Sequence, residues 1–158
     1  MEANNQISKR CREVLLDGTW IANTNFQDQL SDVTWEQAQM KFGSLNSILA
    51  LTFHINYYLA GMLQVFEGGT LDIRDIYSFD YQHIASKDDC EKLLTQFFKN
   101  AELFAEHVAR FSEYKLEEYF VDPKYGSYRR NIEGMIEHSY YHLGQVSLLK
   151  KMISDPPY

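Results

Sequence analysis

The chain has 158 residues, a length typical of one domain, so we expect a single domain spanning residues 1–158. Hydrophobic residues make up 45% of the chain and aromatic residues 15%, which excludes a disordered polar chain and indicates a substantial packed core. The formal net charge is −7 and no basic stripe is present. Neither nucleic acid nor an anionic membrane surface is therefore expected as a partner.

The cellular location is read from the N-terminal segment and the cysteines. The first ten residues contain no apolar run of the kind found in secretory signals, and Cys11 and Cys90 are the only cysteines. Both features favour a cytoplasmic protein with reduced thiols. The most apolar stretch, residues 48–66, contains His54 and Gln64, so we interpret it as a buried helix and not as a membrane span.

Two helices are predicted in the first half of the chain. The first runs from about Asn5 to Asp17 and stops at Gly18, a residue that commonly follows a helix end. The second starts at Thr34, where Thr34-Trp35-Glu36-Gln37 has the form of a capping box, and runs without interruption to about Glu67. The positions of the first helix that are expected to face the core are Ile7, Cys11, Val14 and Leu15.

Two more helices are predicted in the second half. One begins near Ser86 and continues to about Phe111, because apolar residues recur there at alternating spacings of three and four. The other is capped by Ser127 and ends before Pro156. The segment 71–77 alternates between apolar and polar residues, but it stands alone between helices, so we interpret it as part of a connection.

The connection between the second and third helices indicates the topology. Residues 68–85 are numerous enough to run the length of a bundle at roughly 3.3 Å per residue. The second and third helices are then free to run parallel. The sequence therefore predicts an all-α protein, a four-helix bundle of up-down-down-up topology with a long crossover between helices two and three.

The most informative motif is the pair His138 and His142. Four residues make about one helical turn, so both imidazoles project from one stripe of the fourth helix and suit two adjacent positions around one metal ion. Buried neutral histidines need a hydrogen-bond partner or a ligand, so this stripe is expected to hold something. The stripe faces the core because it also carries Met135, Val146, Leu149 and Ile153.

A third histidine, His54, lies on or beside the apolar face of the second helix. If the second and fourth helices are antiparallel, a rise of about 1.5 Å per residue brings His54 level with His138 and His142. Three neutral imidazoles suit a divalent transition metal, with zinc or nickel expected first, and leave positions open for water or substrate. His83 and His107 are interpreted as solvated surface residues.

These residues resemble the DinB-like (YfiT-like) family. The segment 137–145, EHSYYHLGQ, is close to that family's EHxxYHxGQ pattern, and His54 follows Leu51-Thr52-Phe53 in the second helix. The resemblance covers essentially the whole chain in helix order and length. It implies a four-helix bundle that carries a metal on His54, His138 and His142.

The resemblance implies a metal-dependent enzyme acting on a small molecule, with thiol S-transfer as the first expectation and a low-molecular-weight thiol as cosubstrate. A metal-dependent hydrolase of the same fold and a noncatalytic metal-binding bundle are the alternatives. Homodimers among the relatives, together with the high aromatic content, predict a homodimer. The DNA-damage connection in the family's name conflicts with the acidic charge, so DNA binding is not expected.

The residues around the three histidines leave the reaction open, because no carboxylate base is evident beside them. Glu137 precedes His138 but is about 100° away around the helix, so it is expected to face outward. Gln145 and Asn131 lie near the histidine stripe, where each either supports a ligand by hydrogen bonding or only packs. Tyr58, one turn after His54, either hydrogen-bonds a metal-bound group or is a core tyrosine with a satisfied hydroxyl.

Overall fold

The computed structural model describes residues 3–155 and confirms the all-α prediction. Across these residues there are seven α-helices, two 3-10 turns and no strand, only an isolated bridge between Tyr119 and Ser127. The long helices are α1, α4, α5 and α7, at Ala3–Leu15, Ile48–Phe66, Lys87–Arg110 and Tyr128–Ser154. The short ones are α2, α3 and α6, at Phe26–Leu30, Trp35–Gln39 and Glu113–Glu117, with turns η1 at Asp75–Tyr77 and η2 at Pro123–Tyr125.

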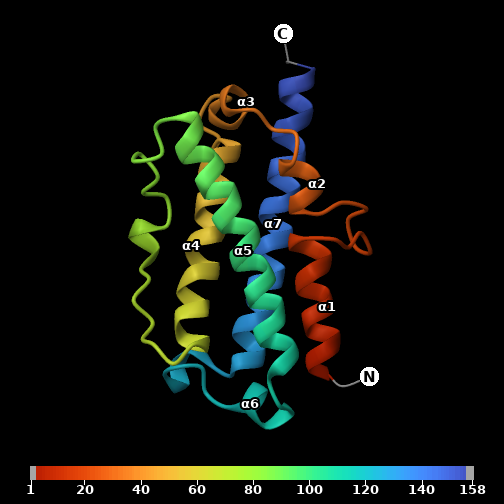
Figure 1. Ribbon diagram of the computed structural model, residues 1–158, viewed down its shortest axis with the longest axis vertical. Helices are drawn as coiled ribbons and strands as arrows, with labels where there is room; N and C mark the ends of the chain where they lie inside the picture. Colours follow the sequence, from red (N-terminus) through yellow and green to blue (C-terminus); the bar gives the residue numbers. More distant parts are fainter. Residues whose placement is uncertain (1–2, 156–158) are drawn as a thin grey trace.

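The four long helices lie side by side around one core (Figure 1). Helix α5 packs against both α1 and α4, and α7 packs against the same two helices from the other side. In the view of Figure 1, α1 and α7 ascend while α4 and α5 descend, and the connection between α4 and α5 returns along the outside of α4. The core at their centre is apolar, and its largest fully buried side chains include Phe26, Phe97 and Phe104.

The prediction of one continuous helix from Thr34 to Glu67 is wrong. The capping box at Thr34 is present, with the Gln37 amide bonding the Thr34 hydroxyl at 3.3 Å, but it caps only the short helix α3. Met40 then has extended backbone angles and Gly43 has a positive φ of 57°, which an α-helix cannot continue through. A new helix, α4, starts after Ser47, whose hydroxyl accepts a hydrogen bond from the Ala50 amide.

The other predicted helices are close to those observed. Helix α1 lies two residues earlier than predicted, and its four core positions are all buried. The cap predicted at Ser127 and the helix start predicted near Ser86 are both confirmed, and each hydroxyl accepts a hydrogen bond from the backbone three residues on. The segment 71–77 forms no strand and belongs to the connection between α4 and α5.

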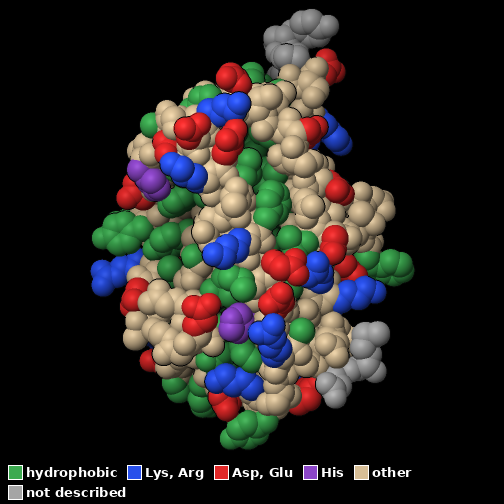
Figure 2. Space-filling view, in the orientation of Figure 1, with side chains coloured by type: hydrophobic (Ala, Val, Ile, Leu, Met, Phe, Trp, Pro, Cys, Tyr) green, Lys and Arg blue, Asp and Glu red, His purple; other side chains and the backbone are tan. Residues whose placement is uncertain are grey.

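Helix α4 is apolar because it lies in the core. It is the one helix within residues 3–155 that is long and apolar enough to cross a membrane, by length and composition only. Of its most apolar window, 67% is buried inside the molecule, which is typical of a core helix. Acidic and basic side chains are interspersed on the face shown in Figure 2.

Candidate metal centre

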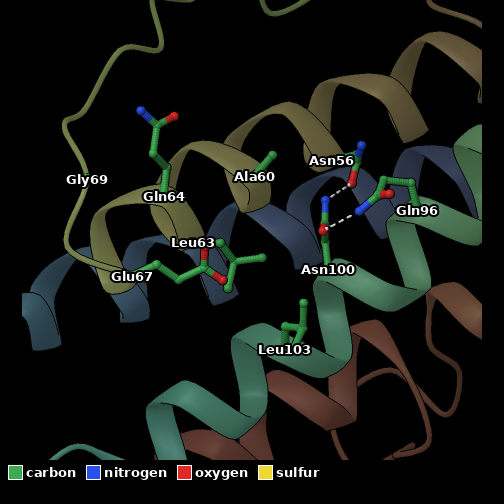
Figure 3. Close-up of a pocket in the computed structure, with 9 residues that line it drawn as sticks. All are labelled: Asn56, Ala60, Leu63, Gln64, Glu67, Gly69, Gln96, Asn100 and Leu103. Carbon is green, nitrogen blue, oxygen red and sulfur yellow. Dashed lines mark hydrogen bonds between the residues drawn. The ribbon is translucent and has the colours of Figure 1, made fainter.

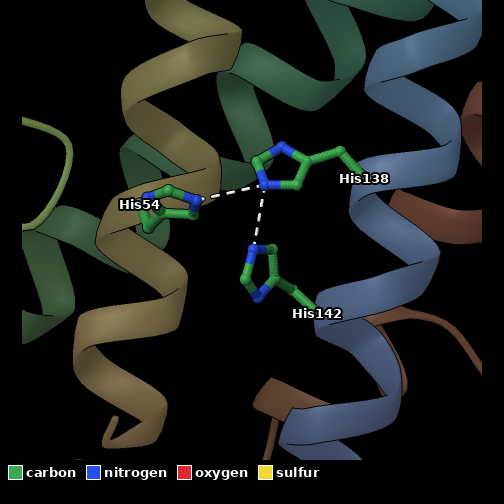
Figure 4. A group of neighbouring side chains, drawn as sticks. All are labelled: His54, His138 and His142. Atoms are coloured by element: carbon green, nitrogen blue, oxygen red, sulfur yellow. Dashed lines mark hydrogen bonds between the residues drawn. The ribbon is translucent and has the colours of Figure 1, made fainter. Parts of the chain in front are cut away.

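The three predicted histidines meet between α4 and α7 (Figure 4). His54 Nε2 lies 3.1 Å from His138 Nε2, and His142 Nε2 lies 2.9 Å from that same atom. All three potential ligand atoms lie within 4.8 Å of one another. His54 and His142 are buried, and His138 is half-buried. Metal binding by the three stays a prediction, but the structure brings the three side chains together.

The level at which they meet follows from the helix geometry. His138 and His142 lie one turn apart on α7, so their rings occupy neighbouring levels of one helix face. His54 lies near the middle of α4, which runs antiparallel to α7 in Figure 1, and faces the same space. The break between α3 and α4 does not change the level of His54 in the bundle. That level depends on the number of residues between His54 and the C-terminal end of α4.

Hydrogen bonds at the far side of two rings define which nitrogen carries the proton. His54 Nδ1 lies 3.3 Å from the backbone oxygen of Ser78, and His142 Nδ1 lies 2.8 Å from Oε1 of Gln145. Both oxygens can only accept, so each Nδ1 donates its hydrogen. The Nε2 atoms of His54 and His142 therefore present lone pairs, and both point at His138 Nε2.

One hydrogen on His138 Nε2 can satisfy only one of these two lone pairs. A cation between the three nitrogens accepts all of them, so the donor set fits a metal better than it fits a hydrogen-bonded cluster. Two nitrogens bound about 2.1 Å from a zinc ion lie about 3.0 to 3.4 Å apart for angles of roughly 90 to 110°. The separations of 2.9 and 3.1 Å are close to this range.

Burial keeps the three rings neutral. It is the main cause that lowers the pKa of His54 and of His138 to about 4, and His142 beside them lowers both further. Burial also lowers the pKa of His142, although the hydrogen bond to Gln145 opposes this shift. Neutral imidazoles are the form that binds metal, so at neutral pH the rings need not lose a proton first.

The connection between α4 and α5 supplies three residues of the site that the sequence did not indicate. The Phe79 ring stacks on the His54 ring, with the two centroids 4.1 Å apart. The Ser78 carbonyl accepts the hydrogen bond from Nδ1 of His54. Asp75 Oδ1 accepts a 2.7 Å hydrogen bond from the Tyr58 hydroxyl. No carboxylate base is evident beside the histidines in the sequence, and the connection brings Asp75 to the hydroxyl of Tyr58, whose ring packs against His54. Asp75 is near enough to raise the pKa of His54 and His138 slightly against the effect of burial.

The connection is held against α4 by two features of that helix. The Tyr57 hydroxyl accepts a 2.8 Å hydrogen bond from the Arg74 amide and donates a 3.1 Å one to the Arg74 carbonyl. A Cβ at Gly61 would overlap the Ile73 side chain, so glycine permits the close approach. Tyrosines and a glycine on a helix face outside the core stripe are a weak signal that another segment covers that face.

The predicted neighbours of the histidines divide into two groups. Gln145 supports His142, and Tyr58 packs its ring 5.0 Å from His54 and 5.3 Å from His138 while its hydroxyl bonds Asp75. Burial and the Asp75 hydrogen bond raise the pKa of Tyr58 to about 12, so this hydroxyl stays protonated. Asn131 instead bonds the carbonyls of Tyr125 and Ser127 and does not contact the histidines.

Two residues interpreted as pointing away from the site do so. Glu137 is exposed, and its carboxylate lies 3.3 Å from Arg130. His83 is exposed at the surface. His107 is only partly solvated, which corrects its interpretation as a plain surface residue. Its ring lies at the edge of the aromatic core near Phe66, and its Nε2 is 3.9 Å from a Glu67 carboxylate oxygen.

A cavity of about 750 Å³ opens beside the histidines, with His138 in its wall. Helices α4 and α7 form two sides, and the connection 68–86 and the segment around η2 cover the others. Tyr58 and Asp75 also line it. The candidate metal centre is therefore accessible to a small molecule from this cavity.

A second cavity, of about 490 Å³, lies between α4 and α5 and has a different chemistry (Figure 3). A chain of amides crosses it, in which Gln96 donates to Asn100 at 2.7 Å and Asn100 donates to Asn56 at 2.8 Å. Its lining contains no histidine or cysteine, and its one acidic residue is Glu67. This cavity therefore offers hydrogen bonds between helices but no nucleophile or ligand cluster.

Comparison with known proteins adds no relative: no family model, no curated protein and no solved structure matches this chain.

Proposed function

We propose that this protein is a metal-dependent enzyme of the DinB-like type, a four-helix bundle that binds a divalent metal through His54, His138 and His142. The observation that carries the proposal is that the Nε2 atoms of His54 and His142 lie 3.1 and 2.9 Å from the Nε2 atom of His138, a residue that lines the cavity of about 750 Å³. A structural site would be closed, with four protein ligands. Among the described residues, only these three form a group able to hold a metal here.

The reaction we favour is transfer of a small thiol to an electrophile. A divalent metal with an open position lowers the pKa of a thiol and so supplies a nucleophile at neutral pH. The chain's own residues position the three rings: Ser78 and Gln145 orient two of them by hydrogen bonds, and Phe79 stacks on the ring of His54. The Tyr58 hydroxyl keeps the Asp75 carboxylate at the cavity wall.

Hydrolysis is the second candidate, and Asp75 is the observation that favours it. A hydrolase needs a base to take a proton from water, and Asp75 is the carboxylate that lines the same cavity as His138. Its hydrogen bond from Tyr58 fixes its direction. Replacement of Asp75 by Asn separates the two candidates, because it removes the base but leaves the three histidines in place.

Cobalt loading tests the proposed function directly. The protein is dialysed against cobalt(II), its metal content is measured, and it is titrated with several biological thiols over a range of pH. We expect one cobalt ion per chain and a strong new absorption band typical of sulfur ligation, which strengthens as pH rises toward the pKa of the free thiol. Bound cobalt with no spectral change at any pH contradicts thiol transfer, and no bound cobalt contradicts the metal centre itself.

We also propose that the protein is a homodimer, which remains an inference from its resemblance and its aromatic content. Large apolar side chains stand exposed on the surface, with Trp20 at 83% and Tyr141 at 66% exposure. Light scattering at micromolar concentration is expected to give twice the monomer mass of 18.6 kDa. A mass near 18.6 kDa contradicts the dimer.

A further inference from the structure

The cavity beside the histidines has a charge opposite to that of the whole chain. The chain carries 15 basic and 22 acidic residues, which gives a net charge of −7. The cavity wall contains Arg74, Lys124 and Arg130 but only one acidic residue, Asp75. The lining is therefore positive by two charges, from three basic residues less one acidic residue. A positive wall in an acidic protein selects for anions.

The basic side chains are available to a ligand. Among the described residues, Arg74 makes no ion pair, and its backbone is anchored at the cavity by the two hydrogen bonds with Tyr57. Arg130 pairs with Glu137 at 3.3 Å, and Lys124 with Asp122 at 3.9 Å, but both pairs are well exposed. Exposed ion pairs of this kind stabilise a fold only weakly, so either cation is free to bind a ligand instead.

Helix α7 places one of these cations along the line that leads to the metal centre. Arg130, Gly134 and His138 follow one another at intervals of four residues, so they share one face of the helix. The Arg130 Nη1 atom lies 3.8 Å from where a Cβ on Gly134 would be. Because Gly134 has no side chain, the position one turn before His138 on this face puts no side chain between Arg130 and His138.

Besides the charged residues, His138 and the polar side chains of Tyr58, Tyr125 and Asn131, the lining contains five apolar side chains. Met62, Phe120 and Met135 are buried side chains of the core, and Leu71 and Ile73 come from the connection. A ligand that fills the cavity thus meets three cationic side chains, several apolar side chains and His138.

We propose that the substrate of this site is a small organic oxyanion, with a carboxylate or phosphate head held by Arg74 and Arg130, assisted by Lys124, and a short apolar body that presents its reacting group to the three histidines. The inference rests on the proposed function for the role of the histidines. The anion-binding part rests only on the charges, the apolar wall and the gap at Gly134. Guanidinium groups are suited to both kinds of head, because they bind planar and tetrahedral oxyanions through paired hydrogen bonds.

A pair of matched probes tests the charge preference. Pentanoate and pentanamide have nearly the same shape and differ in charge, so the ratio of their dissociation constants reports recognition of the anion. We expect pentanoate to bind about tenfold more tightly than pentanamide, the usual scale for a hydrogen bond to a charged group. Pentyl phosphate, in the place of pentanoate, shows which head is preferred. Raised salt is expected to reduce the preference.

Arginine variants assign the preference to these residues. The double variant Arg74→Gln with Arg130→Gln is expected to bring the ratio of the two dissociation constants close to one. Arg110→Gln is the matched control, because Arg110 is also an exposed helical arginine paired with a glutamate, 3.2 Å away. Its ratio is expected to equal that of the wild type. Equal binding of the two probes by the wild type, or an unchanged ratio in the double variant, overturns the proposal.

The titrations are run on zinc-loaded and metal-free protein, which separates this proposal from the proposed function. A carboxylate that only ligates zinc loses its advantage over the amide in the metal-free protein, and that result overturns the anion site. A preference that persists without metal, and disappears in the double variant, supports it. This holds even if the protein binds no zinc, a result that would contradict the metal centre alone.

Discussion

Two pairs of long helices pack in contrasting ways. Helices α1 and α5 form the first pair, and helices α4 and α7 form the second. The first pair contributes fully buried apolar side chains to the core, including Val14 from α1 and Phe97 and Phe104 from α5, all 0% exposed. The second encloses three histidines and borders a cavity of about 750 Å³. The pair α1 and α5 thus stabilises the bundle, whereas the pair α4 and α7 borders the candidate site.

The polar groups on the two sides differ in the same way. Between α1 and α5 the buried Ser8 and Asn4 side chains bond backbone oxygens, since Ser8 donates to the Ala105 carbonyl and Asn4 to the Ala109 carbonyl, each at 2.7 Å. Even the Cys11 thiol there is inert, because burial raises its pKa to about 12. Between α4 and α7 the Nε2 lone pairs of His54 and His142 remain directed into the site. Stability and function are expected to respond to different substitutions.

The largest effect is expected from Phe97→Ala. This fully buried ring packs 5.4 Å from Phe26, so truncation leaves a cavity and lowers the unfolding free energy by about 3 to 5 kcal/mol. Zinc affinity of the folded variant is expected to stay unchanged. Denaturant unfolding measures the loss, with Leu148→Ala, 55% exposed, as a control that stays within about 0.5 kcal/mol. A decrease in unfolding free energy of less than 1 kcal/mol would contradict the prediction that the α1 and α5 side stabilises the fold.

The next effect is expected from removal of any one ligand, for example His138→Ala. Loss of an outer hydrogen-bond partner already weakens metal binding by about 10- to 100-fold, so loss of a ligand is expected to weaken it by at least about 100-fold. The unfolding free energy of the metal-free protein should change less than in Phe97→Ala. Competition with a chelator measures the affinity. His83→Ala and His107→Ala are controls, and full zinc occupancy in His54→Ala would refute the three-histidine assignment.

A smaller effect on the same side is expected from Gln145→Ala. Its oxygen holds His142 Nδ1 at 2.8 Å and so directs Nε2 toward the centre. Loss of this support is expected to weaken zinc binding by about 10- to 100-fold. Asn131→Ala is the matched comparison, because this amide bonds only backbone carbonyls. If the two variants bind zinc equally well, Gln145 does not support the ligand.

The smallest effect is expected from Ser8→Ala, on the closed side. The Ser8 hydroxyl is buried and bonds across to α5, so its loss is expected to lower the unfolding free energy by about 1 kcal/mol and to leave zinc affinity unchanged. Ser154→Ala removes a comparable but exposed bond within α7 and is expected to change stability by less than about 0.5 kcal/mol. A zinc affinity altered by Ser8→Ala would show that the two sides are coupled.

The sequence by itself was enough to predict that the protein is all-helical and which histidines lie together. Both follow from helical patterns in the sequence: His138 and His142 share a stripe with buried residues, and the cap predicted at Ser127 marks the start of α7. These are local properties, since they depend on residues within one or two turns of one another. The break before α4 was missed because Gly43 is compatible with a weakened helix until its backbone angles are known.

The surroundings of the histidines were decided only by the tertiary structure. Asp75, Ser78 and Phe79 lie in a connection without helical periodicity, more than 20 residues from His54 along the chain. They reach the site because Tyr57 and Gly61 on α4 hold the returning segment close to the helix. The basic wall likewise joins Arg74 from the connection with Arg130 from α7. Periodicity describes one helix face at a time, whereas such a site depends on which distant segment packs over that face.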